Sequence, residues 1–152
     1  MNDRRRGLEW FWLIAVLGAC RTPEGEATGD EVRSAAIEIV PGSIVDDKVA
    51  ARGDPVDFKR FQVGPLTPCT INVYWDNPAI DAHLSLRDQF GGLVAELAHA
   101  NGAPKDTIGP IPLKDGTFFL EITAKKGASV YSVELFLGDP ETMGSEAVPW
   151  PE

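Results

Sequence analysis

The stretch TFFLEITAKKGASVYSVELFL, residues 117–137, contains two runs in which apolar and polar side chains alternate. A period of two is typical of strands with one buried face, and Lys126-Gly127 between the runs indicates a tight turn. This pattern predicts a hairpin whose three apolar cross-strand pairs lie on one side. The expected pairs are Phe118 with Leu135, Leu120 with Val133, and Ile122 with Tyr131.

The other side of the predicted hairpin carries Phe119 and Phe136 as diagonal neighbours. Two large rings on a solvent-facing side indicate an interface, or a surface that another part of the chain covers. We expect cover by residues 37–45, because the three isoleucines of that segment otherwise have no place. Together with Tyr74, the two phenylalanines could instead form a stacking platform for a sugar.

Two further stretches, TINVYW (70–75) and DAHLSLRD (81–88), alternate in the same way. Turn signals rich in Gly, Asn and Asp separate the apolar runs, and no segment keeps a helical period. Twelve prolines also disfavour long helices. The sequence therefore predicts an all-β protein, an antiparallel β-sandwich of jelly-roll-like type with one core.

The beginning of the chain has the pattern of an export signal. A basic start is followed by an apolar run at 10–19, which is too short to span a bilayer and ends in small residues. The motif Leu17-Gly18-Ala19-Cys20 resembles the lipobox of bacterial lipoproteins, where the signal peptidase recognises the three residues before an acylated cysteine. We therefore expect residues 1–19 to be removed and the mature chain to be held in membrane lipid through Cys20.

The remaining chain divides into three parts. We expect the lipidated cysteine and a flexible linker at 20–36, a β-sandwich domain at 37–138 and an acidic tail at 139–152. The location predicted is the bacterial cell envelope, facing the periplasm or the cell surface. Arg21 stands where an aspartate retains lipoproteins in the inner membrane of enteric bacteria, which favours the outer membrane.

Charge and cysteine content narrow the function classes. The full chain has 14 basic and 23 acidic residues. Removing the signal takes away three arginines and two acidic residues, which leaves 11 basic and 21 acidic residues and a net charge near −10. Such a chain repels phosphate backbones, so binding of nucleic acid is disfavoured. With Cys20 acylated, Cys69 is expected to be a small buried hydrophobic residue, or alternatively a thiol that pairs with another chain.

Five pieces of the chain recur in the order and spacing of a known family: DPVDFKRF (54–61), DAHLSL (81–86), DQFGGL (88–93), DGTFFL (115–120) and YSVEL (131–135). Through them, residues 54–137 resemble the bacterial pre-peptidase C-terminal domain, a small β-sandwich often appended to secreted peptidases. Some members of that family bind calcium, and others bind polymers such as collagen or glycans. The chain departs from the family pattern at Lys59, where an aromatic residue is usual, and at His83, where a second aspartate is usual.

No catalytic motif is present in the sequence: it has no nucleophile elbow, no HExxH and no glycine-rich phosphate loop. We expect His83 and His99 to be solvated surface residues, since a metal site would need both of them with converging carboxylates. We therefore predict a non-catalytic binding or assembly module for an envelope protein or a glycan. The alternatives are a small metal-dependent hydrolase and a calcium-binding accessory domain of a secreted peptidase system.

Calcium is the one cofactor that the sequence leaves open. The pairs Asp46-Asp47 and Asp54/Asp57 offer the hard oxygen ligands that calcium prefers. Their spacing is not that of an EF-hand, and ordinary turn or surface roles explain them equally well. We therefore expect no resident metal, with calcium as the exception to test.

Overall fold

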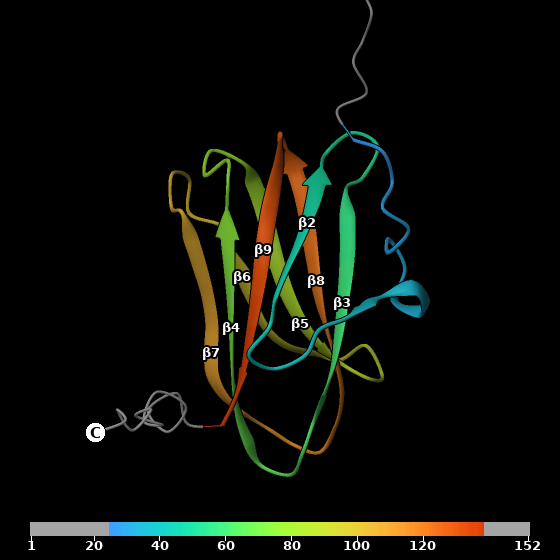
Figure 1. Ribbon diagram of the computed structural model, residues 1–152, viewed down its shortest axis with the longest axis vertical. Coiled ribbons are helices and arrows are strands. Elements are labelled where there is room, and N and C mark those ends of the chain that lie inside the picture. Colours follow the sequence, from blue (N-terminus) through green and yellow to red (C-terminus); the bar gives the residue numbers. More distant parts are fainter. Residues whose placement is uncertain (1–24, 139–152) are drawn as a thin grey trace, which may run out of the picture.

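A computed structural model describes residues 25–138, which form two β-sheets packed face to face (Figure 1). The first sheet has the order β1-β3-β8-β5-β6 and the second the order β2-β9-β4-β7. All paired strands are antiparallel except β1 and β3. The elements are η1 (Arg33–Ala35), a 3-10 turn, and β1 (Ile37–Glu38), β2 (Ile44–Ala50), β3 (Val56–Val63), β4 (Thr67–Trp75), β5 (Asp81–Asp88), β6 (Leu93–Ala98), β7 (Lys105–Leu113), β8 (Gly116–Lys126) and β9 (Ala128–Leu137).

This architecture confirms the predicted all-β sandwich. The alternating stretches become β4, β5, β8 and β9, and their apolar faces meet in one core between the sheets. Within residues 25–138, no helix has the length and apolarity that crossing a bilayer requires. The predicted signal and lipobox, including Leu17, Gly18, Ala19 and Cys20, lie outside the described residues, as does the tail at 139–152.

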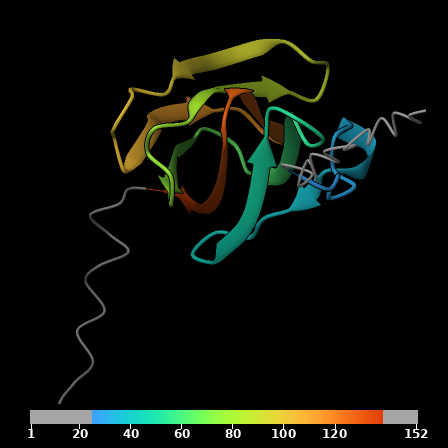
Figure 2. The same ribbon diagram turned by 90° about the horizontal axis from the view of Figure 1, so that it is seen from above.

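The predicted hairpin between β8 and β9 is wrong. β8 lies between β3 and β5 in the first sheet, whereas β9 lies between β2 and β4 in the second. Gly127, at a φ of 82°, lies in the turn that takes the chain from one sheet to the other. Figure 2 shows the two layers of the sandwich from above. The alternation of apolar and polar residues shows which side chains face inward. The same alternation results whether the two strands pair in a hairpin or belong to different sheets, so it could not distinguish the two arrangements. The six expected inward residues are indeed buried, but they line opposite walls of the core: Phe118, Leu120 and Ile122 on one, Tyr131, Val133 and Leu135 on the other.

Cys69 lies in this core, as expected of a small hydrophobic residue. Its side chain points inward from β4, where the strand pairs with both β7 and β9. Burial raises the pKa of the Cys69 thiol to about 12. The thiol is therefore protonated and enclosed, which disfavours the alternative of pairing with another chain.

The segment before β1 belongs to the domain. Residues 25–36 fall in the predicted flexible linker, yet Asp30 is buried and its carbonyl accepts a hydrogen bond from the Phe58 amide at 3.0 Å. Gly25 lies so close to the β2–β3 turn that a Cβ atom on Gly53 would be 2.3 Å from the Gly25 carbonyl oxygen. The domain therefore begins before residue 37, because the polar segment finds partners that are distant in sequence.

Candidate functional site

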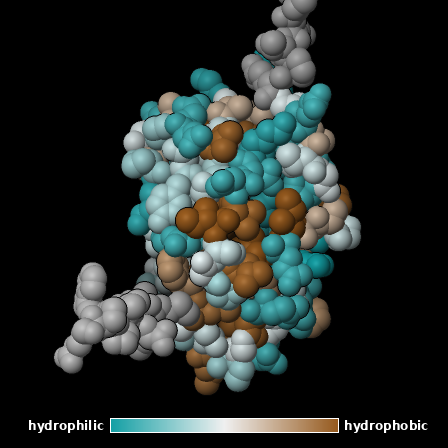
Figure 3. All heavy atoms as spheres, viewed as in Figure 1, coloured by the Kyte–Doolittle hydropathy of each residue, from teal (hydrophilic) through white to brown (hydrophobic). Residues whose placement is uncertain are grey.

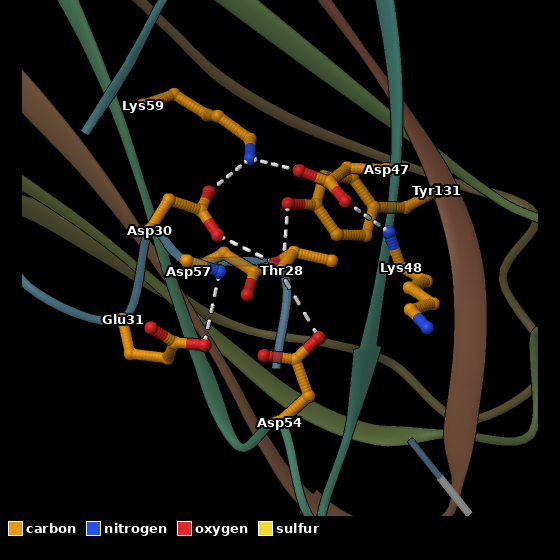
Figure 4. A network of polar contacts seen from close by, with 10 residues as sticks. Thr28, Asp30, Glu31, Asp47, Lys48, Asp54, Asp57, Lys59 and Tyr131 are labelled. Carbon is orange, nitrogen blue, oxygen red and sulfur yellow. Dashed lines mark hydrogen bonds and ion pairs between the residues drawn. The ribbon is translucent and has the colours of Figure 1, made fainter. Parts of the chain in front are cut away.

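Acidic side chains converge where residues 25–36 lie against the sandwich (Figure 4). We use the term acidic cluster for Asp30, Asp47, Asp54, Asp57 and the lysine among them, Lys59. Asp57 and Lys59 point inward from β3 and Asp47 points inward from β2, so both sheets contribute. Asp30 comes from the N-terminal segment. The cluster thus joins the two sheets to the segment that precedes them.

Lys59 is the cation of this cluster. Its side chain has 0% exposure, and its Nζ donates to Asp30 Oδ2 at 2.5 Å and to Asp47 Oδ2. The ammonium also lies 5.6 Å from the centre of the Tyr131 ring. A buried ammonium is costly unless it is paired and hydrogen-bonded, and here two carboxylates provide the pairing.

The other two carboxylates of the cluster are only partly satisfied. The Tyr131 hydroxyl donates to Asp57 Oδ2 at 2.6 Å, and the Thr28 hydroxyl donates to Asp54 Oδ2 at 3.5 Å. The Oδ1 atoms of Asp54 and Asp57 are buried and have no hydrogen-bond partner. Burial raises the pKa of Asp57 to about 7, and the hydrogen bond from Tyr131 opposes the rise. Burial also raises the pKa of Asp54 and that of Tyr131.

Three carboxylates of the acidic cluster lie close enough together to be compared with a metal centre. One carboxylate oxygen each from Asp30, Asp47 and Asp57 lie within 4.8 Å of one another, which is a spacing that a metal ion could bridge. Calcium takes six to eight oxygens at about 2.3–2.6 Å. The Lys59 ammonium already contacts two of these carboxylates at comparable range. A metal ion and the ammonium cannot share this space, so the cluster does not fit a metal while Lys59 is present.

The sequence identified only part of this cluster. Asp46, Asp47, Asp54 and Asp57 were noted as possible calcium ligands beside ordinary turn or surface roles. Three of them come together, but Asp46 faces outward and accepts a hydrogen bond from Ser132 at 2.6 Å. Asp30 was assigned to the linker, and Lys59 drew notice only as a departure from a family pattern. Nothing local in the sequence signals that these two side chains meet, because 29 residues separate them.

The two histidines do not form a shared site. Strand register places His83 opposite Ala98, so His99 is one position further along and its side chain faces the other way. His83 points outward, 3.3 Å from Ser85 Oγ and 3.7 Å from Glu96 Oε2. His99 is buried, which corrects the expectation of a solvated residue. A second set of buried polar groups surrounds it.

We call this second set the His99 cluster, formed by His99, Asp106 and Trp75. His99 Nδ1 lies 2.7 Å from Asp106 Oδ2, and His99 Nε2 lies 3.0 Å from the Pro78 carbonyl oxygen. The Trp75 indole N–H donates to the same Asp106 oxygen at 2.8 Å. These contacts hold together the ends of β4, β6 and β7, so we interpret the cluster as structural.

The aromatic face expected from the sequence is not assembled. Phe119 lies on the outer side of the first sheet, whereas Tyr74 and Phe136 lie on the outer side of the second. The expected cover by residues 37–45 is also wrong, because the Arg33 guanidinium lies 4.4 Å above the Phe119 ring. Arg33 also donates to the carbonyl oxygens of Asp88 and Gln89, at 3.2 and 2.8 Å.

The second sheet has a mixed outer surface. Figure 3 shows apolar residues gathered in the middle of this side, surrounded by polar ones. Ile44 and Val130 are exposed there, and Phe136 is half-buried on β9, diagonal to Ile44. Tyr74 is held flat on the surface by a 3.0 Å hydrogen bond from its hydroxyl to Glu134. Polar contacts therefore interrupt what would otherwise be a continuous aromatic surface.

A groove opens at the end of the sandwich opposite Gly25. It encloses about 330 Å³ between the β5–β6 turn and the β7–β8 turn. Phe90, at its rim, is 86% exposed, and Leu66 on the neighbouring β3–β4 turn is 74% exposed. We call this region the distal groove. Its lining residues are Asp88, Gln89, Phe90, Val94, Pro112, Leu113, Lys114, Asp115, Gly116, Thr117 and Phe118.

Comparison with known proteins places the fold. The structure is similar to the pre-peptidase C-terminal domain of a collagenase from Bacillus anthracis, with 18% identity, coverage of 66% of this chain and 93% of that chain, and a TM-score of 0.54. This similarity agrees with the expected pre-peptidase C-terminal-like sandwich. No protein-family model and no curated protein matches the chain.

Two more distant similarities were found. One is to CorA, a surface-associated copper-binding protein of Methylomicrobium album BG8, with 10% identity, 66% and 96% coverage and a TM-score of 0.47. The other is to PliG of Aeromonas hydrophila, a periplasmic inhibitor of g-type lysozyme, with 8% identity, 67% and 95% coverage and a TM-score of 0.41.

Proposed function

We propose that the chain is a lipid-anchored, non-catalytic binding module of the bacterial cell envelope, with a protein partner at the distal groove. The anchor rests on the lipobox-like motif that ends at Cys20. Gly25, five residues later, is already packed against the β2–β3 turn at one end of the sandwich. Five residues reach about 17 Å when fully extended. An acylated Cys20 would therefore hold this end close to the bilayer, with the outer membrane as the favoured location.

The observation that carries the binding role is the exposed apolar rim at the opposite end. Figure 1 shows the β3–β4 and β7–β8 turns at the end opposite the β2–β3 turn, against which Gly25 packs. Phe90 and Leu66 extend into solvent from turns at this end, and large apolar side chains exposed beside a groove are typical of protein interfaces. An anchored domain would present this end away from the membrane.

A protein partner explains the surface better than a glycan does. Sugar binding needs several aromatic rings on one face together with polar groups, and Tyr74, Phe119 and Phe136 are divided between the two sheets. The distal groove instead combines the Phe90 ring with aliphatic side chains such as Val94 and Leu113. The metal-dependent hydrolase is disfavoured as well, because His83 and His99 point to opposite sides of their strands.

The anchor is tested by replacing the acylated cysteine. Cys20→Ser should abolish acylation and move the protein from the membrane fraction to a soluble or unprocessed form. Cys69→Ser is the matched control, since this buried thiol should leave acylation unchanged. Mass spectrometry of the mature N-terminus checks both. A wild-type chain without acyl groups would contradict the anchor.

The binding site is tested by site-specific photo-crosslinking in intact cells. A crosslinker at Phe90 should capture one discrete protein, whereas the same crosslinker at Lys126, at the membrane-facing end, should not. Adding Leu66→Asp should reduce capture at position 90 without lowering the melting temperature, because Leu66 is exposed on a turn. Equal capture at positions 90 and 126, or none at position 90, would contradict the assignment of the distal groove.

A further inference from the structure

The acidic cluster has the composition of a divalent-cation site, yet it contains a cation that belongs to the chain. Three of its carboxylates place oxygens within 4.8 Å of one another, and Lys59 Nζ lies 2.5 Å from one of them. Calcium binds oxygens at about 2.3–2.6 Å. The ammonium nitrogen therefore already contacts two of the three carboxylates that a bound ion would need.

We propose that the Lys59 ammonium takes the place of a divalent cation, so that the native domain is closed to calcium and becomes a calcium site only when this amine is removed. The cation of this chain is covalently attached. It needs no supply from the surroundings, and it cannot dissociate while the domain stays folded.

A second observation shows that the cluster holds more ligand capacity than Lys59 uses. Asp54 and Asp57 both have 0% exposure, and their Oδ1 atoms have no hydrogen-bond partner. An ammonium has three protons and satisfies two carboxylates here. A calcium ion accepts six to eight oxygens. Removing the amine would leave carboxylates from Asp30, Asp47 and Asp57 around an empty space of suitable size.

The consequence concerns the N-terminal segment. Asp30 is the residue through which this segment contacts Lys59, and the Asp30 carbonyl also accepts the Phe58 amide hydrogen bond. A metal ion at this point would make attachment of the segment depend on calcium concentration. With Lys59 in its place, residues 25–36 stay attached whether calcium is present or not. This inference is independent of the proposed partner and of acylation.

The experiment compares melting temperatures in EDTA and in a calcium series up to 10 mM, a range that includes weak extracellular sites. The variants are wild type, Lys59→Ala, and Lys126→Ala as an exposed lysine control. Wild type and Lys126→Ala should melt at the same temperature in both conditions. Lys59→Ala should melt lower in EDTA, and its melting temperature should rise with the logarithm of calcium concentration, as binding to the folded state alone requires.

A double variant identifies the ligands. Lys59→Ala with Asp47→Asn should lose most of the calcium response, because one carboxylate of the site is gone. A wild-type melting temperature that rises with calcium would overturn the proposal at once. A folded Lys59→Ala protein that ignores calcium would overturn the latent site, and so would a Lys59→Ala chain that stays unfolded at every calcium concentration.

Discussion

The two buried polar clusters of this domain are built in opposite ways. In the His99 cluster, each ring nitrogen faces an oxygen, one from the Asp106 carboxylate and one from the Pro78 carbonyl. The Trp75 indole satisfies the same carboxylate. In the acidic cluster, the single ammonium pairs with two of the four carboxylates, and two carboxylate oxygens have no partner. We call the His99 cluster balanced, because its ring nitrogens and the indole N–H all have partners, and the acidic cluster unbalanced. The balanced cluster is a structural element, whereas the unbalanced one depends on its single cation.

The largest effect should come from removing that cation. Lys59→Met leaves Asp30 and Asp47 buried without a counter-ion, so we expect a loss of about 3–5 kcal/mol in the free energy of unfolding. Urea denaturation measures it, with Lys126→Met as the exposed control. A loss below about 1 kcal/mol would mean that water reaches the cluster and that Lys59 is not its essential cation.

Breaking the balanced cluster should cost somewhat less. Asp106→Ala removes the acceptor for His99 and for the Trp75 indole, so two buried donors lose their partner. We expect a loss of about 2–4 kcal/mol. Unlike a Lys59 variant, this protein should gain no stability from calcium. If calcium restored the free energy of unfolding of the Asp106→Ala protein, the distinction between the two clusters would be wrong.

The acidic cluster should also respond to pH. Burial raises the pKa of its member Asp57 from the ordinary value of 3.8 to about 7, so the folded state keeps a proton that the unfolded state releases. The raised pKa of Asp57 contributes its full amount to the free energy of unfolding below about pH 4, and this contribution is lost as the pH rises through 7. The groups that face it are Lys59, Asp30, Asp54 and the Tyr131 hydroxyl.

This pH effect should be intermediate in size. We expect roughly 1–2 kcal/mol, less than the full shift implies at about 1.4 kcal/mol per pKa unit, because the cluster relaxes as it charges. Asp57→Asn should flatten the stability profile between about pH 4 and 7, measured by urea denaturation. Asp81→Asn, on an exposed strand end, is the control. A wild-type profile that rises over this window would contradict the assignment to Asp57.

The smallest effect should come from the N-terminal segment outside both clusters. Arg33→Ala removes the guanidinium above Phe119 and two hydrogen bonds to backbone carbonyls. We expect a loss of about 0.5–2 kcal/mol. Arg60→Ala, whose partner Glu38 is exposed, should change stability by less than about 0.5 kcal/mol. If Arg33→Ala and Arg60→Ala lower the melting temperature equally, Arg33 does not hold the N-terminal segment on the sandwich.

The sequence predicted what depends on local pattern and missed what depends on distant partners. Alternation identified the inward residues of β8 and β9 correctly, because facing follows from strand periodicity. It could not say that β8 pairs with β3 and β5, since pairing between strands is decided by packing far along the chain. Polar composition made residues 25–36 look like a linker, although Asp30 is one of the most enclosed residues of the domain.

The candidate site follows the same division. The spacing of Asp54 and Asp57 marked them as two carboxylates that could bind a cation, and both belong to the acidic cluster. Lys59, which pairs with Asp30 and Asp47, could not be recognised as the cation of this cluster, because a lysine within a strand is ordinarily exposed. His99 was misassigned for a similar reason. A histidine near a turn is usually solvated, and its partner Asp106 becomes apparent only when β7 is placed beside β4.

Hydrogen exchange at one amide tests the central claim, that a covalently attached cation holds the N-terminal segment in place. The Phe58 amide donates to the Asp30 carbonyl, so its protection reports attachment of the segment. The His99 amide, which donates to Ala82, reports the balanced cluster and serves as reference. We predict that the Phe58 amide exchanges slowly and at the same rate in EDTA and in 10 mM calcium. Fast exchange of Phe58 in EDTA that calcium slows, with the His99 amide unchanged, would contradict the account.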